Sequence, residues 1–284
     1  MMLGEESQSA NYWKKCGDLA LANGIEHVVM MGAHWAVLGD GIEVSGNPKP
    51  EKSPVAYVKP EKYESYALNP DLQMSSRVCD MLKSSGFKAS INEKFDWIHD
   101  TYLILIRMFP SGSPPTTIIS MNARYDPHYH MKVGSCLRPL RSEKVLFIGS
   151  GGAVHNLYRN KWAPMILYRD NFGFAAPPEA WALDFRQEFK NALIGRDDGE
   201  MKGRTGGPEL RRRVTALMKL PGYRDAQATD DHMMSSMFVS GLCGAWEDVG
   251  ILGELGAEDW ELTNMCNAQF TLGQWSIGNL SNQF

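Results

Sequence analysis

The sequence predicts an α/β fold: a single domain, residues 1–284, in which helices cover both faces of a central, mostly parallel or mixed sheet. Two apolar runs of strand length, 116–122 and 144–150, are typical of strands that are buried on both faces of a sheet. A third short apolar run covers 28–32, and segments with helical spacing of apolar residues alternate with these runs. This alternation favours parallel strands joined by helices.

The elements follow in chain order. Residues 9–23 predict an amphipathic helix that Gly24 closes, and 71–86 predicts a second helix that ends at Gly86. A polar loop with several prolines covers 46–70, and 130–141 can form a crossover helix. Further helices are expected at 184–193, around the arginines 211–213 and at 230–246, the last with Thr229 as N-cap. The glycine-rich stretch 196–207 is expected to be an exposed charged loop.

Composition excludes several classes of protein. The net charge of −4 gives no broad basic surface for nucleic acid. The five scattered cysteines contain no Cys-x-x-Cys, as expected of reduced thiols in a cytoplasmic protein. Neither a signal peptide nor an apolar run of ~20 residues is present, so no membrane association is expected. The expected partner is a small molecule, and the chain could form a homodimer.

The stretch VLFIGSGGAVHNL, 145–157, raises the question of whether its glycines bind a dinucleotide phosphate. Val154 stands where the third glycine of a Gly-x-Gly-x-x-Gly motif would be, and no acidic residue follows at the required distance. The alternative is that the glycines allow a tight turn that presents His155 to a pocket. We favour the imidazole over the phosphate site.

Four of the seven histidines stand where α/β enzymes carry their chemistry, at the carboxyl ends of strands or at the start of a helix. They are His34, His99, His155 and His232. Neutral imidazoles ligate iron or zinc, and imidazoles also transfer protons near neutral pH. His27 lies at the far end of the strand that precedes His34, roughly 23 Å away, so these two cannot share an ion. His128 and His130 are expected on the surface.

Four segments together resemble the class III extradiol ring-cleavage dioxygenases, in particular the DOPA-dioxygenase-like branch. The segments are GAHW (32–35), WIHDTYLILIRMFP (97–110), GSGGAVHNL (149–157) and TDDHMMSSMFVSGLCGAW (229–246), in the family's order. The resemblance implies that His34 and His232 ligate a metal, with Fe(II) expected and Zn as the alternative, and that dioxygen is the co-substrate. It further implies catalytic roles for His155 and His99 beside the metal, and supporting roles for Trp35 and Asn156.

Several positions depart from the family pattern. The family carries a metal-binding histidine in a turn near the N-terminus, and no histidine precedes His27 here. The chain therefore either lacks a short N-terminal piece or has lost a metal ligand.

Asp100 stands in place of a glycine and could raise the pKa of the neighbouring His99, which would give Asp100 a part in catalysis. Gln227 replaces a histidine, and Asp231 could contribute to the site or cap the last helix. The aromatic lid of the family is replaced by AYVKPEKYESYALNP (56–70), which leaves the substrate open.

Three functions follow from these observations. The leading one is an Fe(II)-dependent oxidoreductase that opens the ring of a catechol-like or phenolic molecule. The second is a metal-depleted relative that uses His99, His155 and His232 for acid–base lyase, isomerase or cyclase chemistry on a phenolic or polyketide-like substrate. The third is a non-catalytic binding protein, against which the retained His34 and His155 argue.

Overall fold

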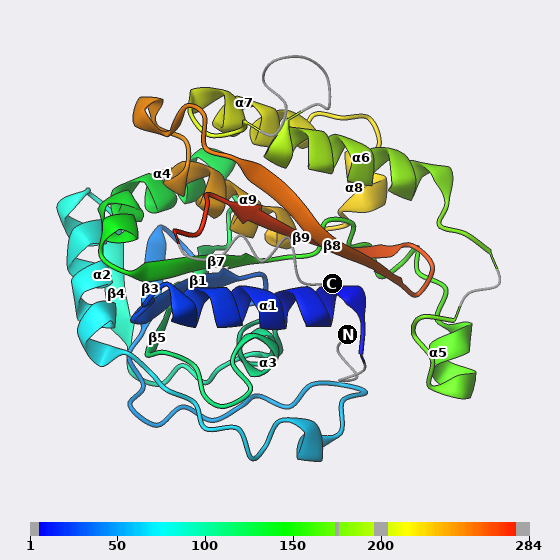
Figure 1. Cartoon of the computed structure of the whole chain (residues 1–284), viewed down its shortest axis with the longest axis horizontal. Helices are drawn as coiled ribbons and strands as arrows, with labels where there is room; N and C mark the ends of the chain where they lie inside the picture. Colours follow the sequence, from blue (N-terminus) through cyan, green and yellow to red (C-terminus); the bar gives the residue numbers. More distant parts are fainter. Residues whose placement is uncertain (1–5, 174–175, 196–203, 277–284) are drawn as a thin grey trace.

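The computed structural model describes residues 6–173, 176–195 and 204–276, and its core is a three-stranded parallel sheet (Figure 1). The helices and strands, in chain order, are α1 (Gln8–Ala22), β1 (His27–Gly32), β2 (Ala36–Val37), β3 (Gly41–Ser45), α2 (Leu72–Ser84), β4 (Lys88–Asn92), α3 (His99–Met108), β5 (Thr116–Ile118), β6 (Met121–Asn122), α4 (Pro127–Leu137), β7 (Val145–Ser150), α5 (Ala163–Tyr168), α6 (Ala180–Ile194), α7 (Pro208–Leu217), α8 (Tyr223–Ala226), α9 (Asp231–Leu242), β8 (Gly253–Glu261) and β9 (Met265–Leu272). Short 3₁₀ helices cover Pro60–Lys62, Arg138–Ser142 and Trp246–Asp248.

The central sheet has the strand order β5-β1-β7, with every neighbouring pair parallel. Val28 and Met30 pack into a core with α3 on one face of β1, whereas Val29 and Met31 pack with α4 and α9 on the other. Because alternate side chains of one strand are buried on opposite faces, the strand is apolar throughout. The predicted α/β class, with helices on both faces, is confirmed.

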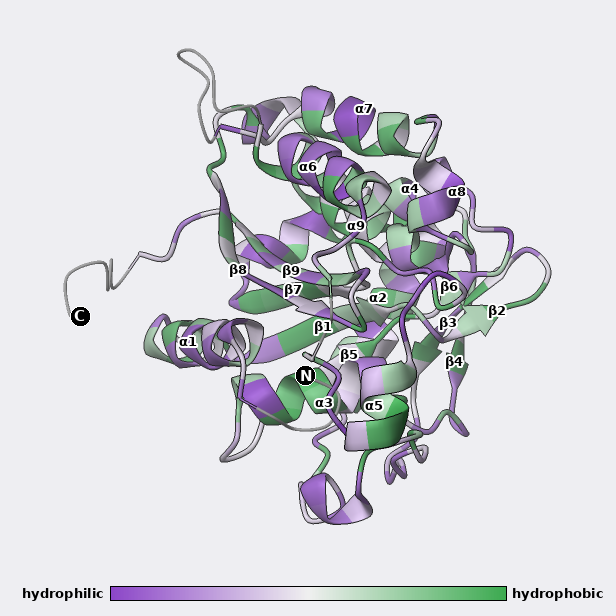
Figure 2. Cartoon of the chain, turned by 90° about the vertical axis from the view of Figure 1, so that its right-hand side faces the viewer, coloured by the Kyte–Doolittle hydropathy of each residue, from purple (hydrophilic) through white to green (hydrophobic). Residues whose placement is uncertain are grey.

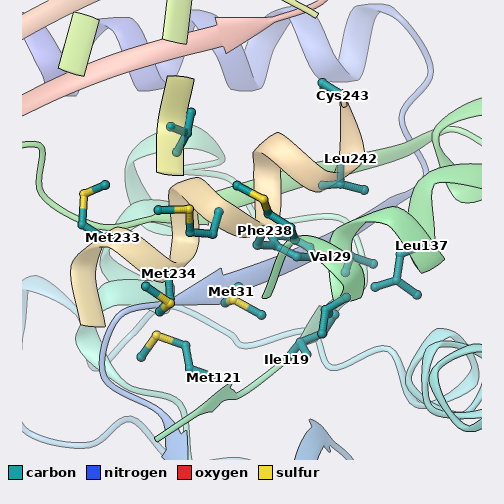
Figure 3. Close-up of a cluster of buried hydrophobic side chains, with 14 of the residues drawn as sticks. Val29, Met31, Ile119, Met121, Leu137, Met233, Met234, Phe238, Leu242 and Cys243 are labelled. Atoms are coloured by element: carbon teal, nitrogen blue, oxygen red, sulfur yellow. The ribbon is translucent and has the colours of Figure 1, made fainter. Parts of the chain in front are cut away.

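Helix α9 forms much of the upper core. Met234 and Phe238 of α9 lie over Met31 of β1, and Leu137 of α4 lies near Val29 in the same cluster (Figure 3). Helices α4 and α9 approach each other through glycine, since a Cβ on Gly241 would lie 2.0 Å from the Met131 carbonyl oxygen. This close approach packs the C-terminal end of α9 against α4.

Three smaller pairs of strands surround the central sheet. Strands β2 and β6, and likewise β3 and β4, pair in parallel, while β8 and β9 form an antiparallel hairpin. The hairpin lies beside β7 and packs on α1 (Figure 1), where the Tyr12 hydroxyl lies 2.6 Å from the Thr271 hydroxyl. In the view of Figure 2, α6 and α7 lie above the hairpin, and polar residues colour much of α7.

The sequence-based element bounds agree with the structure in most places. Residues 46–70 are largely without regular structure, and α4 with the following 3₁₀ turn forms the expected crossover. The residues 196–203 of the predicted charged loop lie outside the described residues. Thr229 is not the N-cap of α9: Asp230 holds that position, and the Thr229 hydroxyl donates to Asp231 Oδ1 at 2.6 Å.

No helix within the described ranges is both long and apolar enough to cross a membrane. All five cysteines are free thiols. The prediction for His130 is wrong, since its side chain is fully buried in α4, whereas His128 is exposed as expected.

Candidate active site

The four predicted histidines lie together, although they come from four separate segments of the chain. The ring centroid of His34 lies 4.5 Å from that of His99 and 5.1 Å from that of His232. The rings of His155 and His232 stack, with centroids 3.6 Å apart. All four line one cavity of about 1570 Å³.

The topology of the sheet brings these side chains together. His34 follows the carboxyl end of β1, and His155 follows the carboxyl end of β7, which is the parallel neighbour of β1. Neighbouring parallel strands end at the same edge of a sheet, so both histidines reach that edge. His99 is the first residue of α3, and His232 lies in the first turn of α9.

Asp100 acts on His34 and not primarily on His99. One carboxylate oxygen, Asp100 Oδ2, accepts hydrogen bonds from the His34 backbone N–H at 2.8 Å and from the His34 ring Nδ1 at 3.0 Å. Gly32 makes room for this carboxylate, because a Cβ on Gly32 would lie 2.4 Å from Asp100 Oδ2. Asp100 therefore orients the His34 ring and fixes its Nδ1 as the donor.

The glycine turn after β7 positions His232. The backbone N–H of Gly152 donates to Nδ1 of His232 at 2.8 Å, and a Cβ on Gly151 would lie 2.2 Å from the His232 carbonyl oxygen. The turn thus packs directly on the first turn of α9, which is why glycine is needed there. Nε2 of His232 is buried and has no hydrogen-bond partner.

Two of the predicted supporting residues hold this turn from outside. The Gln227 amide donates to the carbonyl oxygens of Gly152 at 3.1 Å and Ala153 at 2.9 Å. The Asn156 amide donates to the carbonyl oxygens of Arg224 and Asp225. Both side chains connect the turn that carries His155 to the segment that leads into α9, so they act as positioning residues.

Trp35 and Asp231 lie at the margin of the site. The Trp35 ring stacks on Phe95 with a centroid distance of 3.5 Å. Asp231 Oδ1 accepts hydrogen bonds from its neighbour His232 N–H and from the Thr229 hydroxyl. Asp231 therefore serves the start of α9. Its negative charge favours the protonated forms of His34 and His155, although in His155 the effect of burial is larger.

The four imidazoles differ in their affinity for protons. Burial, with a smaller contribution from the positive charge of His34, lowers the pKa of His155 to about 4. Burial also lowers the pKa of His99, and that of His232 lies well below its usual value for the same reason. For His34, burial is outweighed by the hydrogen bond and charge of Asp100, so its pKa is raised. The expected rise at His99 is wrong, because Asp100 is the smallest influence there.

The fit of a metal ion can be judged from the ring nitrogens. With Nδ1 donating to Asp100, a neutral His34 keeps its lone pair on Nε2, as metal-bound histidines usually do. His232 differs: its Nδ1 accepts from Gly152, so the neutral ring carries its proton on Nε2 and has no free lone pair. Nowhere in residues 6–173, 176–195 and 204–276 are three His, Cys, Asp or Glu side chains grouped to hold a metal. The described residues do not form a complete metal site, and ligation by His34 and His232 stays a prediction.

The roles of two glycines in the site were not predicted from sequence. Gly32 leaves space for the Asp100 carboxylate, and Gly152 donates its N–H group to His232. The spacing of the motifs predicts neither role. His34 and Asp100 were both predicted as site residues. Only the fold reveals that they pair across 66 positions.

The fold and the cluster of imidazoles define an α/β protein with a histidine-rich pocket at the carboxyl edge of its sheet, and the sequence places it in a family. Residues 4–251 match the family described as the catalytic LigB subunit of aromatic ring-opening dioxygenase. The chain belongs to this family, as the four segments predicted.

Individual relatives are similar over parts of the chain. The protein named 4,5-DOPA dioxygenase extradiol of Portulaca grandiflora is 34% identical over 48% of this chain and 47% of its own length. The chain therefore spans about half the length of that relative. A protein of the same name from Escherichia coli K12 is 22% identical over 86% of this chain and 80% of its own length.

A solved structure supports the fold. The crystal structure of an uncharacterized protein from Escherichia coli K12 superposes with a TM-score of 0.70 and 19% sequence identity. The superposition covers 95% of this chain and 94% of that one. At this identity the likeness concerns the arrangement of helices and strands alone.

Proposed function

We propose that the protein is an extradiol-type dioxygenase that opens the ring of a catechol-like or phenolic small molecule. The observation that carries the proposal is the gathering of His34, His99, His155 and His232 on one cavity. Membership of a family of ring-opening dioxygenases supports the reaction type. The names of the DOPA dioxygenase relatives support an aromatic diol as the substrate class.

The histidines can supply the proton transfers that ring opening needs. At neutral pH, His155 is uncharged because its pKa is lowered to about 4, and it can accept a proton from a phenolic hydroxyl. His34, which Asp100 orients through Nδ1, would offer its Nε2 to a metal ion. His99 lies beside His34 and would orient the second hydroxyl.

In the overall reaction both atoms of dioxygen enter the product. The carbon–carbon bond beside the diol breaks, and its two ends become a carbonyl and a carboxylic acid. Fe(II), with Zn as the alternative, is the metal proposed for this reaction. Of the two predicted ligands, only His34 has a ring nitrogen with a free lone pair in its neutral form, so the metal dependence must be measured directly.

A second candidate has its own supporting observation. The neutral tautomer of His232 presents an N–H group in place of a lone pair, which suits a hydrogen-bond donor in acid–base chemistry. A metal-free lyase, isomerase or cyclase acting on a phenolic or polyketide-like molecule would use His155 as the base. Such a reaction would consume no dioxygen.

Oxygen uptake with catechol separates the candidates. The purified chain is incubated anaerobically with Fe(II), Zn(II) or a chelator, then mixed with aerobic catechol while dioxygen and catechol are both followed. Dioxygen and catechol consumed in equal amounts, only with Fe(II) present, is the expected result. Turnover of catechol in chelator without oxygen uptake would favour the second candidate, and absence of turnover in every condition would contradict both.

His155→Gln provides the matched variant. The variant lacks the proposed base, so its rate of catechol turnover should be about 10²- to 10⁴-fold lower, which is the usual contribution of a positioned acid–base group. His128→Gln, at an exposed position on α4, removes an imidazole outside the site and should leave the rate unchanged. Equal rates in the two variants would exclude His155 from the reaction.

A further inference from the structure

A buried carboxylate lines the cavity that contains the histidines. It belongs to Glu261, the last residue of β8, of which only 2% is exposed. Asn171 and Asn267 line the same cavity. A glutamate is rarely buried to this degree unless its carboxylate is paired. Its contacts therefore indicate what this part of the cavity can bind.

Two amide side chains hold the carboxylate, one at each oxygen. The Asn171 Nδ2 group donates to Glu261 Oε1, and the Asn267 Nδ2 group donates to Glu261 Oε2 at 2.5 Å. With its nitrogen turned to Glu261, the Asn171 side chain presents its oxygen as an acceptor. This Oδ1 atom is buried and has no hydrogen-bond partner among the described residues. Since buried polar atoms are nearly always hydrogen-bonded, Oδ1 indicates that a ligand supplies a donor here.

The surroundings of the carboxylate are apolar and aromatic. Trp162 and Met165 pack with Leu262 and Met265, which lie at the turn of the hairpin β8–β9, and all four line the cavity. In Figure 1 this turn lies near α5. The face of an aromatic ring attracts cations, and a carboxylate accepts their N–H groups. An indole and a carboxylate on one wall therefore suit an ammonium group.

The hairpin is joined directly to the turn that carries His155. The Cys266 N–H donates to the carbonyl oxygen of Val154 at 3.0 Å, one residue before His155. Asn267, the next residue of β9, carries one of the amides that hold Glu261. A molecule with its ring beside His155 can therefore extend toward Glu261 within the same cavity.

The turn after Glu261 has an uncommon backbone. Leu262 and Thr263 have φ values of 51° and 70°, in the left-handed region that a β-branched residue rarely adopts. Asn264 is fully buried and stabilises the turn: its Oδ1 accepts from the Glu179 N–H and its Nδ2 donates to the Arg159 carbonyl oxygen, both at 2.9 Å. Such backbone persists only where its surroundings hold it, often at ligand sites.

We propose that this end of the cavity binds an ammonium group of the substrate. The proposal rests on the proposed function, because it makes the substrate a catechol with an amine on its side chain. Glu261 supplies the opposite charge, and Asn171 Oδ1 accepts one N–H. In an α-amino acid a carboxylate shares a carbon with the ammonium group and would lie beside Glu261, where like charges repel. The preferred substrate is therefore a catechol amine without that carboxylate.

Anaerobic calorimetry on the full chain tests the preference, because no ring is opened without dioxygen. Dopamine is compared with 4-ethylcatechol, which lacks the amine, and with DOPA, which adds the carboxylate. Dopamine should bind about 10- to 100-fold more tightly than 4-ethylcatechol, as expected of hydrogen bonds to a charged group, and more tightly than DOPA. Equal affinities for dopamine and 4-ethylcatechol, or tighter binding of DOPA than of dopamine, would overturn the proposal.

Glu261→Gln assigns the preference to this carboxylate. The variant keeps the size of the side chain and removes its charge, so dopamine and 4-ethylcatechol should bind it equally, with the affinity for 4-ethylcatechol unchanged. Glu254→Gln, at an exposed position of the same strand, is the matched control and should retain the preference. A preference that survives in Glu261→Gln would overturn the proposal. If that variant does not fold, the wild-type comparison still decides.

2-Phenylethylamine separates this proposal from the proposed function, because it carries the ammonium group and no diol. Binding of this amine that is lost in Glu261→Gln would support the ammonium site even if no catechol is opened. Oxygen uptake with catechol, in a chain that binds dopamine no better than 4-ethylcatechol, would leave the proposed function standing and overturn the ammonium site.

Discussion

At the scale of single residues, the pairing of Asp100 with His34 is the contact on which the site depends most. The two side chains come from different elements, and one carboxylate oxygen accepts both hydrogen bonds from His34. Only 8% of the Asp100 side chain is exposed, so water cannot readily replace this acceptor. The motif predicted both residues but assigned Asp100 to the adjacent His99, because sequence reports neighbours along the chain and not across the sheet edge.

Asp100→Asn should lower the rate of ring opening while the fold is retained. The variant keeps the size of the side chain but loses the charge that orients His34, and loss of such a partner typically costs about 10–100-fold in activity. Oxygen uptake with catechol measures the change. Asp80→Asn, on α2 with 71% of its side chain exposed, serves as the control, and an Asp100→Asn rate equal to that control would contradict the role assigned to Asp100.

His130 is a structural histidine whose contribution depends on pH. Its Nδ1–H donates to the Asp126 carbonyl oxygen at 2.7 Å, and its Nε2 accepts from the Asn122 N–H at 3.0 Å. Burial lowers its pKa in the folded state, so below about 6.5 the unfolded chain binds a proton that the folded chain does not. The free energy of unfolding therefore falls as pH drops through this range.

The pH profile of stability in His130→Gln tests this account. Urea unfolding between pH 8 and pH 5 should give a shallower loss of stability in the variant than in the wild type. His128→Gln, which lies at an exposed position of the same helix, controls for the removal of an imidazole. Parallel wild-type and His130→Gln profiles would show that His130 does not remain uncharged in the folded protein.

At the scale of elements, the contact between α4 and α9 holds the C-terminal half of α9 in place. Cβ atoms on Gly134 and Gly241 would each lie 2.0 Å from a backbone carbonyl oxygen of the opposite helix, Phe238 for Gly134 and Met131 for Gly241. Glycine normally weakens a helix, and here it allows the two backbones to touch. The sequence predicted both helices but could not show that each of these glycines contacts the backbone of the opposite helix.

Gly241→Ala should destabilise the protein although alanine favours helices. The gain in helix propensity is about 1 kcal/mol, and overpacking against a backbone typically costs about 1–3 kcal/mol or more. Gly222→Ala is the control, since nothing lies within 4 Å of a Cβ there and its φ of −83° suits any residue. Denaturant unfolding measures both, and a Gly241→Ala variant as stable as Gly222→Ala would disprove the close contact.

The hairpin β8–β9 is one of the elements that sequence reasoning missed. Its first strand, GELGAEDWE, contains two glycines and four acidic residues, which are uncommon in strands. Its stability comes from tertiary contacts instead: Arg186 forms an ion pair with Glu258, and Tyr12 contacts both Thr271 and Gly256. Such contacts depend on residues far away in the chain, so a local pattern does not reveal them.

At the scale of the whole molecule, the sequence predicted the parallel sheet and the gathering of the four histidines at one of its edges. The apolar runs at β1, β5 and β7 predicted parallel strands, and parallel strands bring the residues after them to one edge. The convergence of the four histidines follows from that arrangement. The ring orientations do not, because they depend on hydrogen bonds such as that from Gly152 to His232.

The large cavity is likewise a property of the assembled chain. The segment after β7 bridges to β9 at Val154 and Cys266, and residues of both strands line the cavity together with the four histidines. No single segment of sequence carries this information.

The central claim is that four histidines from distant segments surround one pocket that binds an aromatic diol. Nuclear magnetic resonance of the seven imidazole rings during a catechol titration tests it most directly. The account predicts that the ring signals of His34, His99, His155 and His232 shift together along one binding curve, while those of His27, His128 and His130 stay in place. Shifts confined to the second group, or a saturating catechol titration that moves none of the first, would contradict it.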